Sequence, residues 1–372
     1  MTTNWITNRN FDLLWYIGAC LTSYAMIYLN LALGISAVML WWIWIVSVDG
    51  PHVFATISRT YLDTQEREER RRLLLGSLLW FLLGPLCIAA AILSGAPMIF
   101  FMFITFAQLW AYWHVVRQHY GFLCMYQKKN GEPAGKANQL DYWIFYILML
   151  APFVSFLLRH PSARYQLGLG PVLSTPEHYA LIFLHSLIAL ALIVYVFKEA
   201  RNKTFNLPKN VFLMAAVPLH LLIFLHPYIS THVDIRLFAV FVTFYHNIQY
   251  HGIVWFYNRN RYRQDSSGAR FGWASKVSRN FLTFYAVAII FTLLYRYPNW
   301  YFAGTEIPFF GWQNNPVSRA MIGGSSFTIS DLAIGFWWGF AFNHYYLDQK
   351  IWKLSKDKRL NQDLRIATPQ TV

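Results

Sequence analysis

Charged residues are scarce in this sequence. Only 13% of its 372 residues are Asp, Glu, Lys or Arg, whereas ordinary soluble domains contain roughly 25%. Hydrophobic residues make up 56% of the chain and aromatic residues 19%. This composition predicts an integral membrane protein, and the 16 Trp residues fit the aromatic belts that form at bilayer interfaces.

Cysteine is scarce as well. Cys20, Cys87 and Cys124 are isolated and form no C-x-x-C motif, which argues against a disulfide framework. The first twelve residues lack the basic start of a secretory signal peptide and no cleavage site follows, so we expect no removed leader. The net charge of +14 comes without any RNA- or DNA-binding motif, so we expect no nucleic-acid partner.

Long apolar runs are what the sequence has instead. Ten of them are long enough to cross roughly 30 Å of hydrocarbon as helices. Because backbone groups inside a bilayer must be satisfied within the protein, the sequence predicts an all-α, polytopic integral membrane helix bundle. We expect one transmembrane domain over residues 1–372. The ten runs lie near 11–29, 31–48, 73–93, 98–116, 141–158, 178–197, 211–225, 235–257, 280–296 and 328–347.

The positions of Lys and Arg predict the orientation. With both termini cytoplasmic, nearly all of the 31 basic residues fall on the cytoplasmic side, as the positive-inside rule requires. The exceptions are Arg159, Arg164, Arg236, Arg296 and Arg319. The predicted cytoplasmic parts are an extension at about 49–72, a basic loop at about 258–279 and the tail 348–372. We therefore expect a multi-pass protein, of the inner membrane if it is bacterial.

Six histidines fall at the cytoplasmic ends of four predicted spans. They are His52, His114, His119, His246, His251 and His344. A single histidine at such a place is most simply explained by a hydrogen bond between helices. Six at one depth indicate a functional site, because ionisable groups are costly in a membrane, and imidazole is a common ligand of Fe, Zn, Cu and Ni. We predict a metal centre near the cytoplasmic side.

The remaining six histidines are expected to be interfacial or structural. They are His160, His178, His185, His220, His226 and His232.

Two of the predicted ligand pairs have an unusual spacing. His114 and His119 are five residues apart, and so are His246 and His251. At 3.6 residues per turn this spacing leaves two rings about 140° apart around a helix. Either the helix is locally widened by a π-bulge, or one ring of each pair points elsewhere.

Several polar residues accompany the histidines. Asp348 lies four residues after His344 and could bind a metal or orient the imidazole. Asp49 precedes Pro51 and is interpreted first as a helix N-cap, with a supporting role at the metal as the alternative. The full set of candidate ligands and supporting residues is Asp49, Gln118, Asn247, Tyr250, Asn343 and Asp348.

These histidine patches have a counterpart in a known family. Their order resembles the four-part histidine pattern of the bacterial and archaeal membrane β-carotene 15,15′-dioxygenases of the Brp/Blh type. The four patches are Gly50-Pro51-His52 beside an Asp, then His114, then the region of His246 to His251, and then His344 before Asp348. More loosely, the H-x-x-x-x-H pairs are similar to the histidine boxes of membrane non-haem iron oxygenases. The resemblance implies non-haem iron, O2 and a lipid-soluble substrate.

The functional prediction is an O2-dependent oxygenase with one or two iron ions, acting on an isoprenoid, a carotenoid or a fatty acyl chain. Its expected partners are membrane lipids, the hydrophobic substrate, O2 and an acidic electron carrier docked on the basic loop at about 258–279. Two alternatives stay open, a haem-binding electron-transfer protein and a zinc-dependent lipid hydrolase. A transporter is disfavoured, because its site would lie near the midplane of the membrane.

Overall fold

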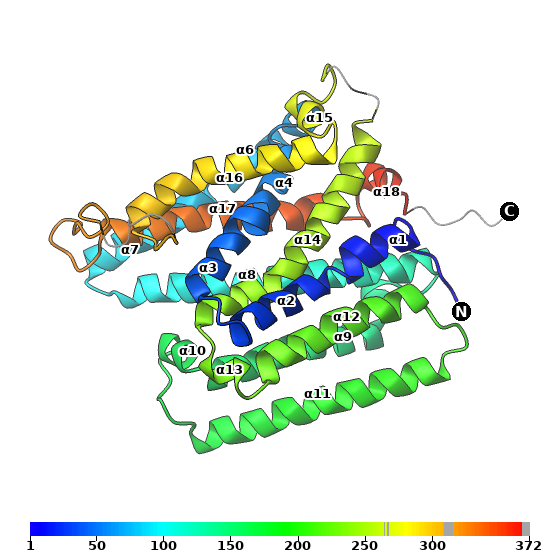
Figure 1. Ribbon diagram of the computed structural model, residues 1–372, viewed down its shortest axis with the longest axis horizontal. Coiled ribbons are helices and arrows are strands. Elements are labelled where there is room, and N and C mark those ends of the chain that lie inside the picture. The colour runs from blue at the N-terminus through cyan, green and yellow to red at the C-terminus, as the bar shows by residue number, and fades with distance from the viewer. Residues whose placement is uncertain (264, 266–267, 309–314, 367–372) are drawn as a thin grey trace. The chain divides into compact units, whose positions relative to one another are not determined.

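Helices make up the fold. The computed structural model describes residues 1–263, 265, 268–308 and 315–366, and over these residues the chain forms helices and turns, without a β-strand (Figure 1). A helix satisfies its own backbone donors and acceptors, which suits a chain so poor in charge. The all-helical prediction is confirmed for the described residues.

Eight helices in the described part of the chain are long and apolar enough to cross a membrane. Three of them are compound and consist of shorter consecutive helical segments: Arg9–Leu31, Ala37–Thr60 and Arg71–Ser94. The eight are Arg9–Leu31, Ala37–Thr60, Arg71–Ser94, Met98–Lys129, Gln139–Arg159, Thr175–Arg201, Leu207–Leu225 and Phe281–Ala303. Each overlaps a predicted run, although Ala37–Thr60 and Met98–Lys129 extend beyond the predicted ends near 48 and 116.

The other two predicted spans are helices of lower hydropathy. α14 runs from Ile235 to Arg261 and α17 from Ile329 to Ile351. Both carry the polar side chains of the predicted site, including His246, His251 and His344, and these side chains are buried. These polar residues of the predicted site lower the hydropathy of the two helices. A total of ten spans, like the orientation of the termini, stays a prediction.

The chain divides into two compact units, which are described separately. Unit 1 comprises Met1–Gly34, Trp113–Gln249 and Leu364–Val372. Unit 2 comprises Ile35–Tyr112 and Tyr250–Asp363. The long helices α8 (Met98–Lys129) and α14 each contribute residues to both units.

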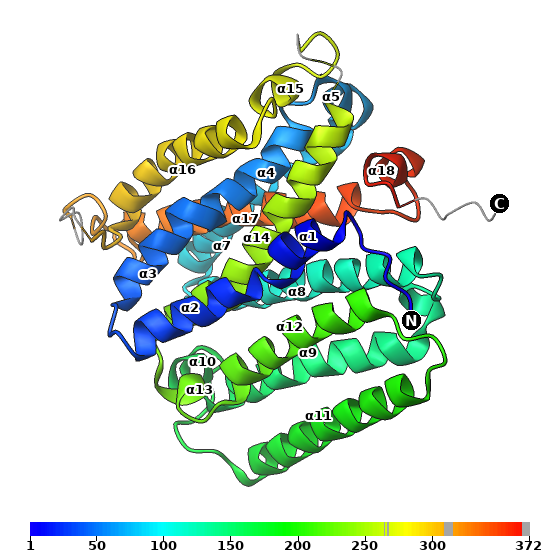
Figure 2. The same ribbon diagram turned by 45° about the vertical axis from the view of Figure 1, so that its right-hand side comes forward.

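Unit 1 is organised around α9. This helix, Gln139–Arg159, packs against both α11 (Thr175–Arg201) and α12 (Leu207–Leu225), as Figure 2 shows. Ile144, Leu148, Ile188, Ala191 and Val217 form the apolar core between them. The smaller elements of the unit are α1 (Arg9–Phe11), η1 (Asp12–Ile17), α2 (Cys20–Leu31), η3 (Gly135–Ala137), α10 (Pro161–Gln166) and α13 (Ile229–His232).

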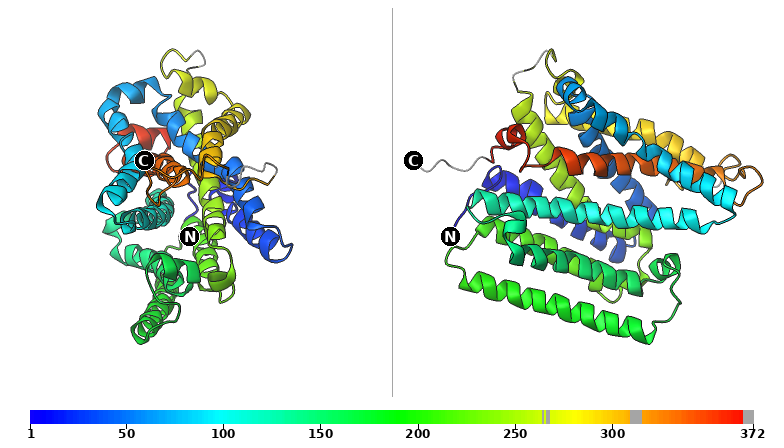
Figure 3. Two further views of the ribbon diagram at one scale, coloured as in Figure 1. Left: turned by 90° about the vertical axis from the view of Figure 1, so that its left-hand side faces the viewer. Right: turned by 180° about the vertical axis from the view of Figure 1, so that it is seen from behind.

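Unit 2 contains the close pair α7 (Trp80–Ser94) and α17, which lie side by side (Figure 3). Two glycines allow this approach, because a Cβ added to Gly84 would lie 2.2 Å from the carbonyl oxygen of Gly335. Small residues at such contacts are typical of membrane helix pairs. The other elements are α3 (Ala37–Trp44), η2 (Ile45–Asp49), α4 (Gly50–Thr60), α5 (Thr64–Glu69), α6 (Arg71–Ser77), α15 (Trp273–Val277), α16 (Phe281–Ala303) and α18 (Lys358–Asp363).

The prediction that Asp49 caps a new helix is wrong. Asp49 has helical dihedral angles and makes no capping hydrogen bond, because the chain continues from α3 through the π-helical turn η2 directly into α4. Its carboxylate instead accepts a hydrogen bond from Nη2 of Arg296, at 2.9 Å. The helix that contains His52 therefore runs on to Thr60, well past the predicted end of the span near residue 48.

The glycine contact between α7 and α17 can be tested by adding one methyl group. Gly84→Ala is expected to lower the stability of the protein by about 1–3 kcal/mol, because the methyl group forces the two backbones apart. Thermal unfolding of the detergent-purified protein measures the change. Gly76→Ala in α6 is the control, since a Cβ there meets nothing within 4 Å. Equal melting temperatures for both variants and the unmodified protein would contradict this account of the packing.

Candidate metal centre

Two histidines of unit 2 meet through their ring nitrogens. His52 on α4 and His344 on α17 are both buried, and their Nε2 atoms lie 2.7 Å apart. Two imidazole nitrogens at about 2.1 Å from one ion would lie roughly 3.0 Å apart at a right angle and roughly 3.4 Å apart in a tetrahedral site. Both belong to a group of buried histidines that could hold a metal ion. The identity of the metal is not fixed by the ligands alone, since imidazole suits Fe, Zn, Cu and Ni.

A hydrogen-bond network behind His344 sets its tautomer. Its Nδ1 lies 2.7 Å from Oγ1 of Thr56. The hydroxyls of Thr56 and Tyr250 both donate to Oδ1 of Asp348, at 2.9 and 2.7 Å. Because the Thr56 hydroxyl donates its proton to the Asp348 carboxylate, the Thr56 oxygen accepts a hydrogen bond from Nδ1 of His344. Nε2 of His344 is left with a lone pair directed toward His52, which is the form that binds a metal.

Helical spacing assembles this network from few elements. His52 and Thr56 are four residues apart on α4, and His344 and Asp348 are four apart on α17, so each pair lies on one helix face. Tyr250 accepts a further hydrogen bond from Nε1 of Trp352, at 3.2 Å. The predicted supporting roles of Asp348 and Tyr250 correspond to actual contacts, while Thr56 and Trp352 were not predicted, because neither stands in a histidine motif.

His251 supports the helix that carries His52. Pro51 has no N–H for the carbonyl of Ser47, and the π-helical turn η2 also loosens the bonds of its neighbours. The hydroxyl of Tyr285 donates to the Ser47 carbonyl, and Nε2 of His251 donates to the Val48 carbonyl at 3.2 Å. The ring of His251 lies 6.3 Å from that of His52, centroid to centroid. His251 is therefore a positioning residue in unit 2.

Asn343 has a different role from its neighbour His344. Its Nδ2 donates to the hydroxyl of Tyr61 at 2.8 Å and to that of Ser77 at 3.0 Å. These contacts join α17 to α6 and to the end of α4. Asn343 is thus used in helix packing within unit 2.

Unit 1 holds a second group of histidines. The ring centroids of His114 and His246 are 5.1 Å apart, and those of His119 and His246 are 6.3 Å apart. His119 donates from Nδ1 to the carbonyl of Val115 at 2.9 Å, which leaves a lone pair on Nε2. That nitrogen is buried and has no hydrogen-bond partner among the described residues. A buried lone pair of this kind is able to accept a hydrogen bond or to bind a metal ion.

His220 of α12 lies close to this group, and the structural role expected for it stays a prediction. Its ring lies 5.4 Å from that of His119, and the side chain is fully buried. The sequence signal was weak, because His220 stands alone in an apolar run. Its partner on another helix becomes visible only when α8 and α12 are packed together.

Two amides complete the surroundings in unit 1. Gln118 donates from Nε2 to the backbone carbonyl of His246, at 2.8 Å, and so touches the helix and not the imidazole. Asn247 is buried, and its Nδ2 has no hydrogen-bond partner in the described part of the chain. Of these two candidate supporting residues, Gln118 has a defined role in joining α8 to α14.

The five-residue spacing is accommodated without helix distortion. α8 is a regular α-helix through His114 and His119, and α14 through His246 and His251. The π-helical turns occur elsewhere, in η1 and η2. The rings of His246 and His251 have different neighbours, since His246 lies near His114 whereas His251 bonds Val48. The rings of His114 and His119 both lie near His246.

The six predicted ligands are thus distributed over both units. His52, His251 and His344 lie in unit 2, and His114, His119 and His246 in unit 1. Convergence of all six on a single centre stays a prediction.

Comparisons of the chain with protein-family models, with curated proteins and with solved structures found no match. The case for a function therefore rests on the geometry of the histidines and their partners.

The network behind His344 can be tested at Thr56. Thr56→Val removes the hydroxyl shared by Tyr250, His344 and Asp348, and we expect it to destabilise the protein by about 1–3 kcal/mol, because buried polar groups lose their partner. Thr60→Val is the control on the same helix, since the Thr60 hydroxyl bonds only to the carbonyl of Thr56. Thermal unfolding of both purified variants gives the comparison. A loss no larger for Thr56→Val than for Thr60→Val would refute the network.

Proposed function

We propose that this protein is a membrane-embedded, histidine-ligated non-haem iron oxygenase that acts on a lipid-soluble substrate. The observation that carries the proposal is the approach of the Nε2 atoms of His52 and His344 to 2.7 Å. Both rings are buried, and the tautomer of His344 is held by Thr56 and Asp348.

Iron is the metal proposed because it can bind imidazole and leave positions open for O2. When bound, it would supply O2 activation for cleavage, hydroxylation or desaturation of a hydrocarbon. The protein residues would hold it and exclude water: His52 and His344 as ligands, and Asp348 through Thr56 as the group that keeps His344 in its binding form. The resemblance to Brp/Blh dioxygenases favours the same metal and an isoprenoid or carotenoid among the substrates.

A second iron is proposed in unit 1. His119 presents a buried Nε2 that lacks a hydrogen-bond partner, and His220 and His246 lie beside it. A metal ion would use this lone pair, whose direction is fixed by the hydrogen bond of Nδ1 to Val115. The proposal thus extends to two ions, with His220 added to the ligands expected from the sequence.

Apolar outer surfaces support a lipid-soluble substrate. Large hydrophobic side chains stand exposed along α7, α11 and α16, which is typical of helices in contact with lipid. They include Leu82, Leu86, Leu93, Ile182, Phe183, Ile193, Leu282, Ile290 and Leu294. A hydrocarbon dissolved in the bilayer would reach such a protein without passing through water.

Haem is a poorer fit to the His52–His344 pair. Axial imidazoles on opposite sides of a haem iron place their nitrogens about 4 Å apart, twice a metal–nitrogen bond of about 2.0 Å. The observed separation of 2.7 Å leaves no room for a porphyrin between the rings. Zinc would suit the same pair and would favour a hydrolase, so the choice between iron and zinc falls to metal analysis.

Metal content tests the first ion. We expect the purified protein to contain iron, and His52→Ala or His344→Ala to lose at least one equivalent, because each removes a ligand. His160→Ala serves as the matched control: His160 is also buried, but its Nε2 donates to the carbonyl of Val233 at 3.0 Å. Elemental analysis and the absorption spectrum would be recorded together. Full iron content in both site variants would reject the proposal, zinc alone would indicate the hydrolase, and a Soret band would indicate haem.

The second ion has its own variant. His119→Ala is expected to lower the metal content by one equivalent while a metal remains at His52 and His344, because the two groups of histidines lie in different units. His220→Ala should have the same effect if it shares the ion. Metal quantification and an iron spectroscopy that separates one-ion from two-ion centres would decide. Unchanged metal content in His119→Ala would limit the proposal to a single ion.

A further inference from the structure

Arg59 is a fully buried cation on α4, two helical turns after His52. It follows Thr56 on α4 by three residues, and only 1% of its surface is exposed. Its guanidinium carbon lies 4.1 Å from the ring centroid of Tyr257 and 3.9 Å from that of Trp352. The two aromatic rings pack against the guanidinium group and stabilise its charge through cation–π contacts.

The hydrogen-bond donors of this guanidinium are largely unused. Nε and Nη1 are buried and have no hydrogen-bond partner among the described residues. Nη2 reaches the backbone carbonyl of Ile351 only at 3.5 Å, the outer limit for a hydrogen bond. A buried donor without an acceptor is costly, and the cost is larger for a charged group.

Neighbouring carboxylates do not neutralise Arg59. Within the described residues no carboxylate oxygen lies within 4.0 Å of it, while Glu66 pairs with Arg70 at 2.8 Å and with Arg261 at 3.6 Å. A buried charge normally needs a partner of opposite sign. Among the described residues Arg59 therefore makes no direct ion pair, and the carboxylates of Glu66, Asp357 and Asp363 act on it only from a longer distance.

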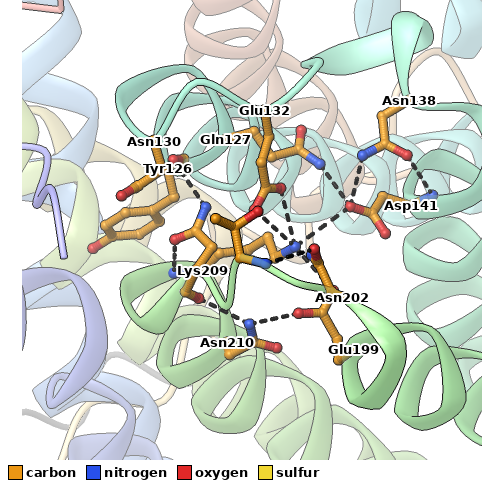
Figure 4. Close-up of polar contacts among 12 residues, drawn as sticks. Tyr126, Gln127, Asn130, Glu132, Asn138, Asp141, Glu199, Asn202, Lys209 and Asn210 are labelled. Atoms are coloured by element: carbon orange, nitrogen blue, oxygen red, sulfur yellow. Dashed lines mark hydrogen bonds and ion pairs between the residues drawn. The ribbon is translucent and has the colours of Figure 1, made fainter. Parts of the chain in front are cut away.

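Lys209 shows how the same chain treats another buried cation. Its Nζ lies 3.0 Å from carboxylate oxygens of both Glu132 and Glu199, with Asp141 at 3.8 Å (Figure 4). Arg261 likewise meets Asp63 at 3.0 Å. Lys209 and Arg261 are both held by carboxylates, whereas Arg59 lacks such a contact among the described residues. A structural ion pair therefore does not explain Arg59.

We infer that Arg59 binds an oxyanion, a carboxylate or a phosphate, and that this group is the head group of the lipid on which the proposed iron centre acts. Guanidinium is the side chain best suited to such anions, because it is planar and always charged. The assignment of the anion to a substrate rests on the proposed function. Binding of the anion itself rests only on the unused donors of Arg59.

Two connections join Arg59 to the histidines. His52, Thr56 and Arg59 occupy positions i, i+4 and i+7 of α4, which lie on one helix face. Trp352 packs against Arg59 and donates its indole N–H to Tyr250, which bonds Asp348. Seven residues of helix correspond to about 10 Å. If the head group of the lipid is held at Arg59, a carbon in the middle of the lipid's hydrocarbon chain would lie beside His52. The carbon next to the head group would not reach it.

Binding measurements on the full-length, detergent-purified protein test this inference. Palmitate is the anionic lipid probe, hexadecanol has the same chain length without the charge, and inorganic phosphate is the free oxyanion. Palmitate should bind more tightly than hexadecanol. Arg59→Gln should weaken palmitate binding by about tenfold or more, the effect of losing a charge-assisted hydrogen bond, and leave hexadecanol binding unchanged. Arg59→Lys, which keeps the charge, should bind palmitate with an affinity between those of Arg59→Gln and the unmodified protein.

Arg117→Gln is the matched control. Arg117 also lies near aromatic rings, those of Trp113 and Tyr120, but it already donates to the hydroxyl of Tyr146 at 2.6 Å. Its replacement should leave palmitate affinity unchanged. Size-exclusion profiles and melting temperatures of all variants would show that they are folded, and the lysine variant preserves the test if the glutamine variant is not.

The outcomes separate the inference from the proposed function. Palmitate affinity that is equal in Arg59→Gln and the unmodified protein would overturn the inference. Phosphate binding that depends on Arg59, without such dependence for palmitate, would identify a free oxyanion and overturn the lipid assignment. Iron content is measured in the same samples, and Arg59→Gln should retain it. A protein without iron that still binds palmitate through Arg59 would refute the oxygenase and support the anion site.

Discussion

The partnering of buried polar groups is the constraint on which the rest of this structure depends. Where apolar helices exclude water, a polar group must find its partner within the protein or bind something from outside. The chain meets this requirement in detail at most places. Tyr285 and His251 donate to the carbonyls that Pro51 and the π-helical turn release, and Arg296 donates to Asp49. The exceptions therefore carry information.

The exceptions point to ligands of opposite kinds. Nε2 of His119 is a buried lone pair without a donor, which suits a cation such as a metal ion. Nε and Nη1 of Arg59 are buried donors without an acceptor, which suits an anion. The His52–His344 pair differs from these, because its two Nε2 atoms lie within hydrogen-bonding distance of each other. The proposed metal oxygenase with an anionic lipid substrate would use all three places.

The sequence predicted the elements of this arrangement better than their contacts. Hydropathy located the helices, and helical spacing correctly linked Asp348 to His344. It failed at Asp49, because a Pro in the second position after Asp normally marks a helix start, whereas here the π-helical turn η2 lets the helix continue through Pro51. Thr56 could not be singled out from the sequence, since its side-chain partners Tyr250, His344 and Asp348 lie more than 190 positions away.

The central claim, a metal ion bound by His52 and His344, can be tested most directly by X-ray absorption at the iron edge of the purified protein. The account predicts nitrogen ligands at about 2.1 Å with the multiple-scattering pattern of imidazole, and a weaker imidazole contribution in His344→Ala. A spectrum without imidazole scattering, or one that is identical in the unmodified protein and His344→Ala, would contradict it.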